Sequence, residues 1–292
     1  MHRLARELAA QLGLECASEP ERVIAGSRVH RCYRWRCADG VLFVKTAPAQ
    51  ASARLAAEAA GLQALGEANA IRVPRVRAQG VAGDDAFIAL EWIEARPNTP
   101  SSERELGRRL AALHAMHAER FGWESDNYIG RSVQLNGWCE RWATLWRERR
   151  LRPQLELAVQ HGYGRLLEAP GARVLEAVEP LLSGHQPAPS LLHGDLWAGN
   201  WCTDPEGQPV IFDPAVYCGD RETDLAMTRL FGGFEADFYA AYQDAAPLPE
   251  GHALRTDLYN LYHVLNHANL FGGGYVEQAR ILIERLLAHT RG

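Results

Sequence analysis

Several features that define other protein classes are missing from this chain of 292 residues. It has no apolar run near the length that spans a bilayer, so we expect no membrane insertion. Its formal net charge of −5 provides no overall positive field, so we expect no nucleic-acid partner. No internal repeat or low-complexity segment occurs. The composition, 47% hydrophobic and 23% charged, is typical of a soluble globular protein.

Cysteine is present but not in the patterns that indicate a disulfide framework or a zinc ribbon. None of the six forms a C-x-x-C pair, so we expect mostly reduced thiols packed as small apolar side chains. The six are Cys16, Cys32, Cys37, Cys139, Cys202 and Cys218. The first eight residues mix charged and apolar side chains, unlike a signal peptide, and we therefore expect a cytoplasmic protein.

The order of predicted elements indicates an α+β fold with two lobes. A helix over 2–14 and another over 49–65 flank short strands near Val23, at 30–37, 41–45, 73–80 and 86–93. An Asp39-Gly40 turn joins two of these strands. We predict residues 1–93 as an N-terminal nucleotide-binding lobe, 94–100 as a linker, and 101–292 as a mainly helical catalytic lobe.

In the second lobe, the helix after the linker should be capped by Ser101 or Ser102. Two segments are expected to be irregular, 119–136 and 187–220. The predicted helices cover 102–118, 137–150, 151–168, 171–183 and 222–245, and two more begin near 254 and 276.

The most informative pattern lies within the second irregular segment. Asp195 and Asn200 are separated by four residues after an apolar pair, and Asp213 closes an apolar run. Phosphoryl transfer from ATP needs a carboxylate at the attacking hydroxyl, and an amide oxygen with a second carboxylate on Mg²⁺. Each residue alone is typical of a turn. Their combined spacing favours a kinase loop, with Asp195 as the catalytic base and Asn200 and Asp213 as metal ligands.

The first lobe contains candidates for the nucleotide side of such a site. Lys45 ends a strand on the face shared by Val41 and Phe43, which suits a point charge on the ATP phosphates. Glu58, on the following helix, would hold that lysine in place, although a glutamate on a helix is more often solvated.

Two further segments of the first lobe would contact the nucleotide. The turn from Gly26 to Arg28 should cover the phosphates, with only one glycine to shape it. Main-chain groups from Glu91 to Ile93 should meet the adenine.

The chain resembles the fructosamine/ketosamine kinase family on these motifs and others. The Leu196-Trp197 pair inside the loop is its most specific feature, and 121–138, 213–226, 231–234 and Asn266-His267 extend the match. The resemblance implies a protein-kinase-like, aminoglycoside-phosphotransferase-like fold. It also implies ATP with Mg²⁺, and phosphorylation of the 3-hydroxyl of a ketosamine, free or protein-bound, which leads to deglycation.

The same resemblance implies roles for several further residues. Asn136, Trp197 and His267 would bind the ketosamine, and Asp224 would brace the catalytic loop. Trp197 has an alternative as a side chain that fills the lobe core. Arg28 stands where some relatives have cysteine, so we expect no redox control through that turn.

The sequence allows three interpretations of the function. A ketosamine kinase acting as a monomer or weak homodimer is the first. The second keeps the chemistry but has another alcohol as acceptor, such as an aminoglycoside, choline or homoserine. The third is a nucleotide-binding regulator without activity, which the presence of Lys45, Asp195, Asn200 and Asp213 disfavours.

Overall fold

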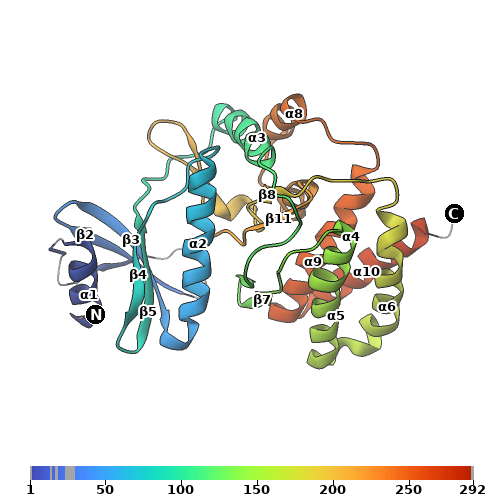
Figure 1. The fold of residues 1–292 in the computed structure, drawn as a ribbon, viewed down its shortest axis with the longest axis horizontal. Coiled ribbons are helices and arrows are strands. Elements are labelled where there is room, and N and C mark those ends of the chain that lie inside the picture. Colours follow the sequence, from blue (N-terminus) through green and yellow to red (C-terminus); the bar gives the residue numbers. More distant parts are fainter. Residues whose placement is uncertain (1, 14, 17–18, 24–29, 291–292) are drawn as a thin grey trace.

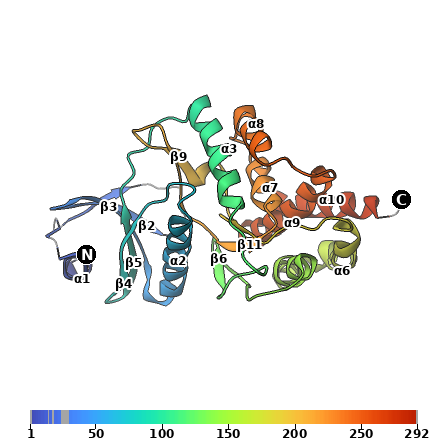
Figure 2. The same cartoon turned by 45° about the horizontal axis from the view of Figure 1, so that its top comes forward.

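The computed structural model describes residues 2–13, 15–16, 19–23 and 30–290. A β-sheet with two helices forms one end of the molecule, and a helical body forms the other (Figure 1). This arrangement confirms the predicted α+β fold. The helix α2 (Ser52–Ala68) lies between the sheet and the helical body in both views (Figures 1 and 2).

The sheet has five antiparallel strands in the order β1-β2-β3-β5-β4. The expected hairpin is confirmed, but its turn is Ala38-Asp39, because Cys37 pairs with Gly40, the first residue of β3. The strands are β1 (Glu21–Val23), β2 (Arg31–Cys37), β3 (Gly40–Pro48), β4 (Val76–Ala82) and β5 (Asp85–Glu91).

The two faces of the sheet have separate cores, which fixes the direction of each side chain on β3. Leu42 and Val44 belong to the cluster that contains Leu4 and Leu8 of α1 (His2–Leu12). Since successive side chains of a strand point to opposite faces, the side chain of Lys45 points toward α2. Phe43 packs against the core on the same side, so the predicted shared face is confirmed, but the strand continues past Lys45 to Pro48 and does not end there.

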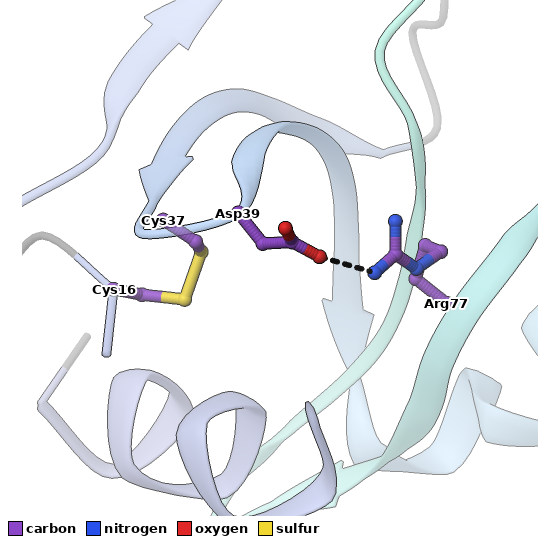
Figure 3. The surroundings of a disulfide bond; sticks show 4 residues. All are labelled: Cys16, Cys37, Asp39 and Arg77. Atoms are coloured by element: carbon purple, nitrogen blue, oxygen red, sulfur yellow. Dashed lines mark ion pairs between the residues drawn. A yellow bond between two sulfur atoms is a disulfide. The ribbon is translucent and has the colours of Figure 1, made fainter. Parts of the chain in front are cut away.

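One disulfide is an exception to the expectation that the thiols are mostly reduced. Cys16 and Cys37 are bonded, 21 residues apart in sequence, beside an ion pair of 3.6 Å between Asp39 and Arg77 (Figure 3). The disulfide forms because the chain after α1 returns along the β2–β3 hairpin, where Ala38 N donates to Glu15 O at 2.8 Å. Sequence spacing does not encode that return. The other four cysteines are free, as expected.

The helical body is built from α3 onward. The segments Trp146–Leu151 and Val159–Tyr163 continue the helical path as π-helical turns. The helices are α3 (Pro100–His114), α4 (Trp142–Leu145), α5 (Arg152–Ala158), α6 (Gly164–Leu181), α7 (Glu222–Leu230), α8 (Ala236–Ala245), α9 (His252–Phe271) and α10 (Gly274–His289). None of the helices in the described part of the chain is long and apolar enough to cross a bilayer.

Several helix boundaries differ from the prediction, including the end of α3 at His114 and the start of α4 at Trp142. The cap of α3 is Thr99, whose hydroxyl accepts from Ser102 N at 3.2 Å, so Ser102 is the third helical residue and not the cap. The predicted helix over 222–245 is two helices, because Gly232 and Gly233 have φ of 70° and 88° between them. The predicted break before 171 lies instead at Gly162, with φ of 89°.

Short two-stranded sheets occupy the segments that we expected to be irregular. β8 pairs with β11, β9 with β10, and β6 with β7, all antiparallel. They are β6 (Asn127–Ile129), β7 (Ser132–Gln134), β8 (Ser190–Leu192), β9 (Trp201–Thr203), β10 (Pro209–Ile211) and β11 (Tyr217–Gly219). Their pairing holds the loops 193–200 and 212–216 next to each other.

A buried carboxyl at the start of α3 makes stability depend on pH. Glu103 is 4% exposed and its Oε2 has no hydrogen-bond partner. Burial, with Glu235 and Asp237 nearby, raises the pKa of Glu103 to about 7 from 4.5. The folded state therefore binds a proton that the unfolded chain releases, and stability should fall as pH rises from 4.5 to 7.

We predict that Glu103→Gln reduces this slope and stabilises the protein at pH 8, on the order of 1 kcal/mol. Chemical denaturation at several pH values measures it. Glu105→Gln on the same helix is the matched control. Its arginine partners Arg108 and Arg109 lower the pKa of Glu105, so its removal should not reduce the slope. Parallel slopes for wild type and Glu103→Gln would contradict the prediction.

Candidate active site

The loop 193–200 leaves β8 and enters β9, and its first turn requires glycine. Gly194 has φ of 83°, and a side chain there would collide with the Ala215 carbonyl. The neighbouring loop approaches this closely because Ala215 N donates to His193 O at 2.9 Å. Protein kinases have arginine at this position in the motif. Here the close contact of the two loops leaves no space for it.

A buried carboxylate fixes the backbone of this loop. Asp224, on α7, accepts from the N–H groups of His193 and Gly194, each at 2.8 Å. It also bonds to Nε2 of His114 at 3.1 Å. Burial alone would raise the pKa of Asp224, but His114, His193 and the Gly194 N–H lower it. The carboxylate is therefore charged. The bracing role that the resemblance implied for Asp224 agrees with this geometry.

His114 extends the brace to a residue that the sequence did not indicate. Its Nδ1 lies 2.9 Å from the hydroxyl of Tyr242 on α8. Because Asp224 is charged and only accepts, we assign the proton of His114 to Nε2, and Nδ1 then accepts from Tyr242. A buried histidine carries no distinguishing sequence signal, so its role was missed.

Asn200 connects the two expected carboxylates. Its Nδ2 donates to Asp195 O at 2.8 Å, and lies 3.4 Å from Asp195 Oδ2 and 3.5 Å from Asp213 O. Asp213 has the left-handed φ of 57°, which an aspartate tolerates better than most residues. Burial, followed by the charges of Asp213 and Asp224, raises the pKa of Asp195 to about 7. A carboxyl with this pKa can accept a proton near neutral pH.

Lys45 completes the cluster from the other lobe. Its Nζ lies 2.7 Å from Glu58 Oε1 on α2 and bonds to Asp213 Oδ1. The lysine is 2% exposed. Burial would lower the pKa of Lys45, but Asp213 and Glu58 raise it above its usual value, so the ammonium is retained. The solvated alternative for Glu58 is therefore wrong. Lys45 is also the only lysine in the chain.

The residues expected to meet the adenine and cover the phosphates are only partly described. Glu91 ends β5, and its carboxylate pairs with Arg72 at 2.7 Å. The N–H of Glu91 donates to Arg75 O at 2.9 Å. Ile93 follows, half-buried and outside the strand. Gly26 and Arg28 lie outside the described residues.

The three expected substrate residues differ in accessibility. Trp197 is 39% exposed, so the alternative that it fills the core is wrong. His267 is half-buried, and its Nδ1 lies 2.8 Å from His263 O. Asn136 is buried, and its amide donates to Ser125 O at 3.0 Å and accepts from Arg150 at 2.8 Å. The structure thus uses Asn136 to support the site and does not present it to a ligand.

The fold and this cluster define the class of protein, a phosphotransferase of the kinase-like fold. Solved structures of low sequence identity share that fold, among them an aminoglycoside phosphotransferase, APH(4)-Ia, with a TM-score of 0.62 and 14% identity over 99% of this chain and 98% of that one. The fructosamine kinase family matches residues 1–289. The chain belongs to that family, and it is an enzyme.

Proteins that are similar in sequence or structure match this chain over nearly its whole length. A probable ketoamine kinase of Synechocystis sp. is 41% identical, covering 97% of this chain and 96% of that protein. The probable ketoamine kinase YniA of Escherichia coli is 38% identical over 98% of both. A putative fructosamine-3-kinase of Thermobifida fusca YX-ER1 has a TM-score of 0.87, 34% identity and 99% coverage of both chains.

The brace on the catalytic loop can be tested through His114. We predict that His114→Phe lowers kcat about tenfold or more, because a buried carboxylate loses a partner. The KM for ATP should change little. His114→Gln retains a donor and should restore most of the rate. The exposed His117, changed to Phe, is the matched control. Equal losses of kcat in His114→Phe and His114→Gln would show that the ring only fills space.

The single lysine permits a direct test of the nucleotide site. An acyl phosphate of ATP transfers its acyl group to an amine beside the phosphates. We predict that mass spectrometry finds one acylated lysine, Lys45, that excess ATP protects it, and that Lys45→Arg abolishes the adduct. Acylation of the terminal amine alone would place the phosphates elsewhere. Lys45→Met should also lower kcat/KM for ATP by roughly a hundredfold or more.

Proposed function

We propose that the protein transfers the γ-phosphoryl group of ATP to the 3-hydroxyl of a ketosamine. The convergence of Asp195, Asn200, Asp213 and Lys45 at the junction of the two lobes supports this proposal best. The membership in the fructosamine kinase family supports the substrate class. Because the 3-phosphate of a ketosamine decomposes and releases the amine, the physiological role would be deglycation.

The donor atoms of the cluster fit a magnesium ion. Mg²⁺ prefers carboxylate and amide oxygens, which Asp213 and Asn200 provide on adjacent loops. Nδ2 of Asn200 faces Asp195 O, so its amide oxygen is the atom that would serve as a ligand. When bound, the ion would neutralise charge on the phosphates. Lys45 adds a fixed positive charge beside it.

Asp195 would act on the acceptor hydroxyl. Its carboxylate orients the hydroxyl for in-line attack and takes its proton as the new bond to phosphorus forms. Asp224 and Asn200 fix its backbone, so the position of the carboxylate is set before the substrate arrives. In a loose transition state, such positioning supplies much of the acceleration.

The substrate class is tested by ADP release on addition of N-fructosyl-glycine, with choline, kanamycin and an ATP-only blank as comparisons. We expect ADP release above the blank with the fructosylamine and not with choline or kanamycin. Phosphorus NMR should locate the phosphate on C3. The 3-phosphate should then decompose and release the free amine. Release with choline or kanamycin but not with the fructosylamine would assign a different acceptor to the same chemistry.

We predict that Asp195→Asn lowers kcat by about 10²–10⁴-fold, since the amide cannot accept the proton. Binding of ATP, measured by calorimetry, should stay close to that of the wild type because the lysine and the metal ligands remain. Glu206→Gln, at an exposed carboxylate on the β9–β10 turn, is the control. Turnover that survives Asp195→Asn would exclude this residue as the base.

A further inference from the structure

A row of aromatic rings runs from the catalytic loop to the junction of α9 and α10. The ring centroids of Trp197 and Phe231 are 6.4 Å apart, and those of Phe231 and His267 are 4.9 Å apart. His267 lies 5.5 Å from Phe271 and 5.1 Å from Tyr275. We call these five residues the aromatic row.

Much of the row is open to solvent. Trp197, Phe231 and Phe271 are 39%, 40% and 53% exposed. Large aromatic side chains are usually well buried, and contiguous exposed ones commonly mark a binding surface. The three residues come from separate segments of the chain, namely the catalytic loop, the break between α7 and α8, and the end of α9. The fold therefore brings these three side chains, which are distant in sequence, into one row.

The beginning of the row is held beside the catalytic carboxyl. Trp197 is two residues from Asp195, and its ring lies over Gly199, where any side chain would overlap it. Gly233 packs in the same way against Ala198. These two glycines allow the segment after Phe231 to lie directly on the catalytic loop. The aromatic surface is thus continuous with the site.

The chemistry of a ketosamine places its amine on this surface. Only two carbon atoms, C2 and C1, separate C3, which carries the hydroxyl, from the amine nitrogen. With the hydroxyl at Asp195, the nitrogen therefore lies within a few bonds, close to Trp197. A protonated secondary amine is favoured by an aromatic face. The substituent on the nitrogen then extends outward along the row.

We propose that Phe231, Phe271 and Tyr275 form a subsite for the amine substituent, which selects ketosamines whose amine has an apolar aromatic or alkyl group. This inference depends on the proposed function. Burial lowers the pKa of His267, so the imidazole is neutral and the row itself offers no charge to a carboxylate. A small or acidic substituent would gain little from this surface, and an apolar one gains by covering it.

The test compares N-fructosyl-benzylamine with N-fructosyl-methylamine, which share the sugar and differ only in the substituent. We expect the wild type to prefer the benzylamine adduct about tenfold in kcat/KM, and Phe271→Ala to remove most of that preference through KM. Phe271→Tyr keeps the ring and should keep the preference. Ile281→Ala removes an exposed apolar side chain elsewhere on α10 and should leave both rates unchanged.

Melting curves establish that each variant is folded. Turnover of both adducts, with a ratio that neither Phe271→Ala nor Phe231→Leu alters, would overturn the subsite and leave the proposed function standing. No turnover of either adduct would remove the proposed function and the subsite together. A ratio that falls in Phe271→Ala and returns in Phe271→Tyr would support the subsite.

Discussion

The ammonium of Lys45 is the constraint on which the two lobes depend. It is buried, and burial of a lone charge is so unfavourable that the group would lose its proton without partners. Glu58 comes from α2 in one lobe and Asp213 from the loop after β10 in the other. One cation therefore couples the position of α2 to that of the catalytic loops. Removing it would leave two carboxylates facing each other at the junction.

The packing around this ion contact is adapted to keep the lobes close. Gly61 of α2 lies against Pro214 and Val216, so that a side chain there would be crowded by both. On the far side, Asp224 holds the backbone of the catalytic loop, and Ala215 N bonds to His193 O. The acid, the amide and the lysine are thus placed by contacts outside the reacting groups. Such support is what pre-organises a site for phosphoryl transfer.

Local chemical motifs and periodicity predicted residues that the structure brings together. The spacing of Asp195, Asn200 and Asp213, and the alternation that places Lys45 on the face of Val41 and Phe43, follow from short stretches of chain. Contacts between distant segments left no such local pattern and were not predicted. The Cys16–Cys37 bond needs the path after α1, and the burial of Asn136 needs Arg150 from the following helical segment. The sequence indicated only part of the aromatic row, because Phe271 and Tyr275 lie in predicted helices and carry no motif.

The composition of the cationic side chains fits the same constraint. Of 31 lysines and arginines, 30 are arginine and one is lysine. Arginine serves at surface ion pairs such as Arg104 with Asp237 and Arg285 with Asp257. A compact ammonium differs from a planar guanidinium, and between Glu58 and Asp213 it acts as a point charge. The one lysine of the chain thus stands at the position where we propose that the phosphates bind. A further consequence is that its described surface presents no lysine amine, the group that reacts with the carbonyl of a reducing sugar.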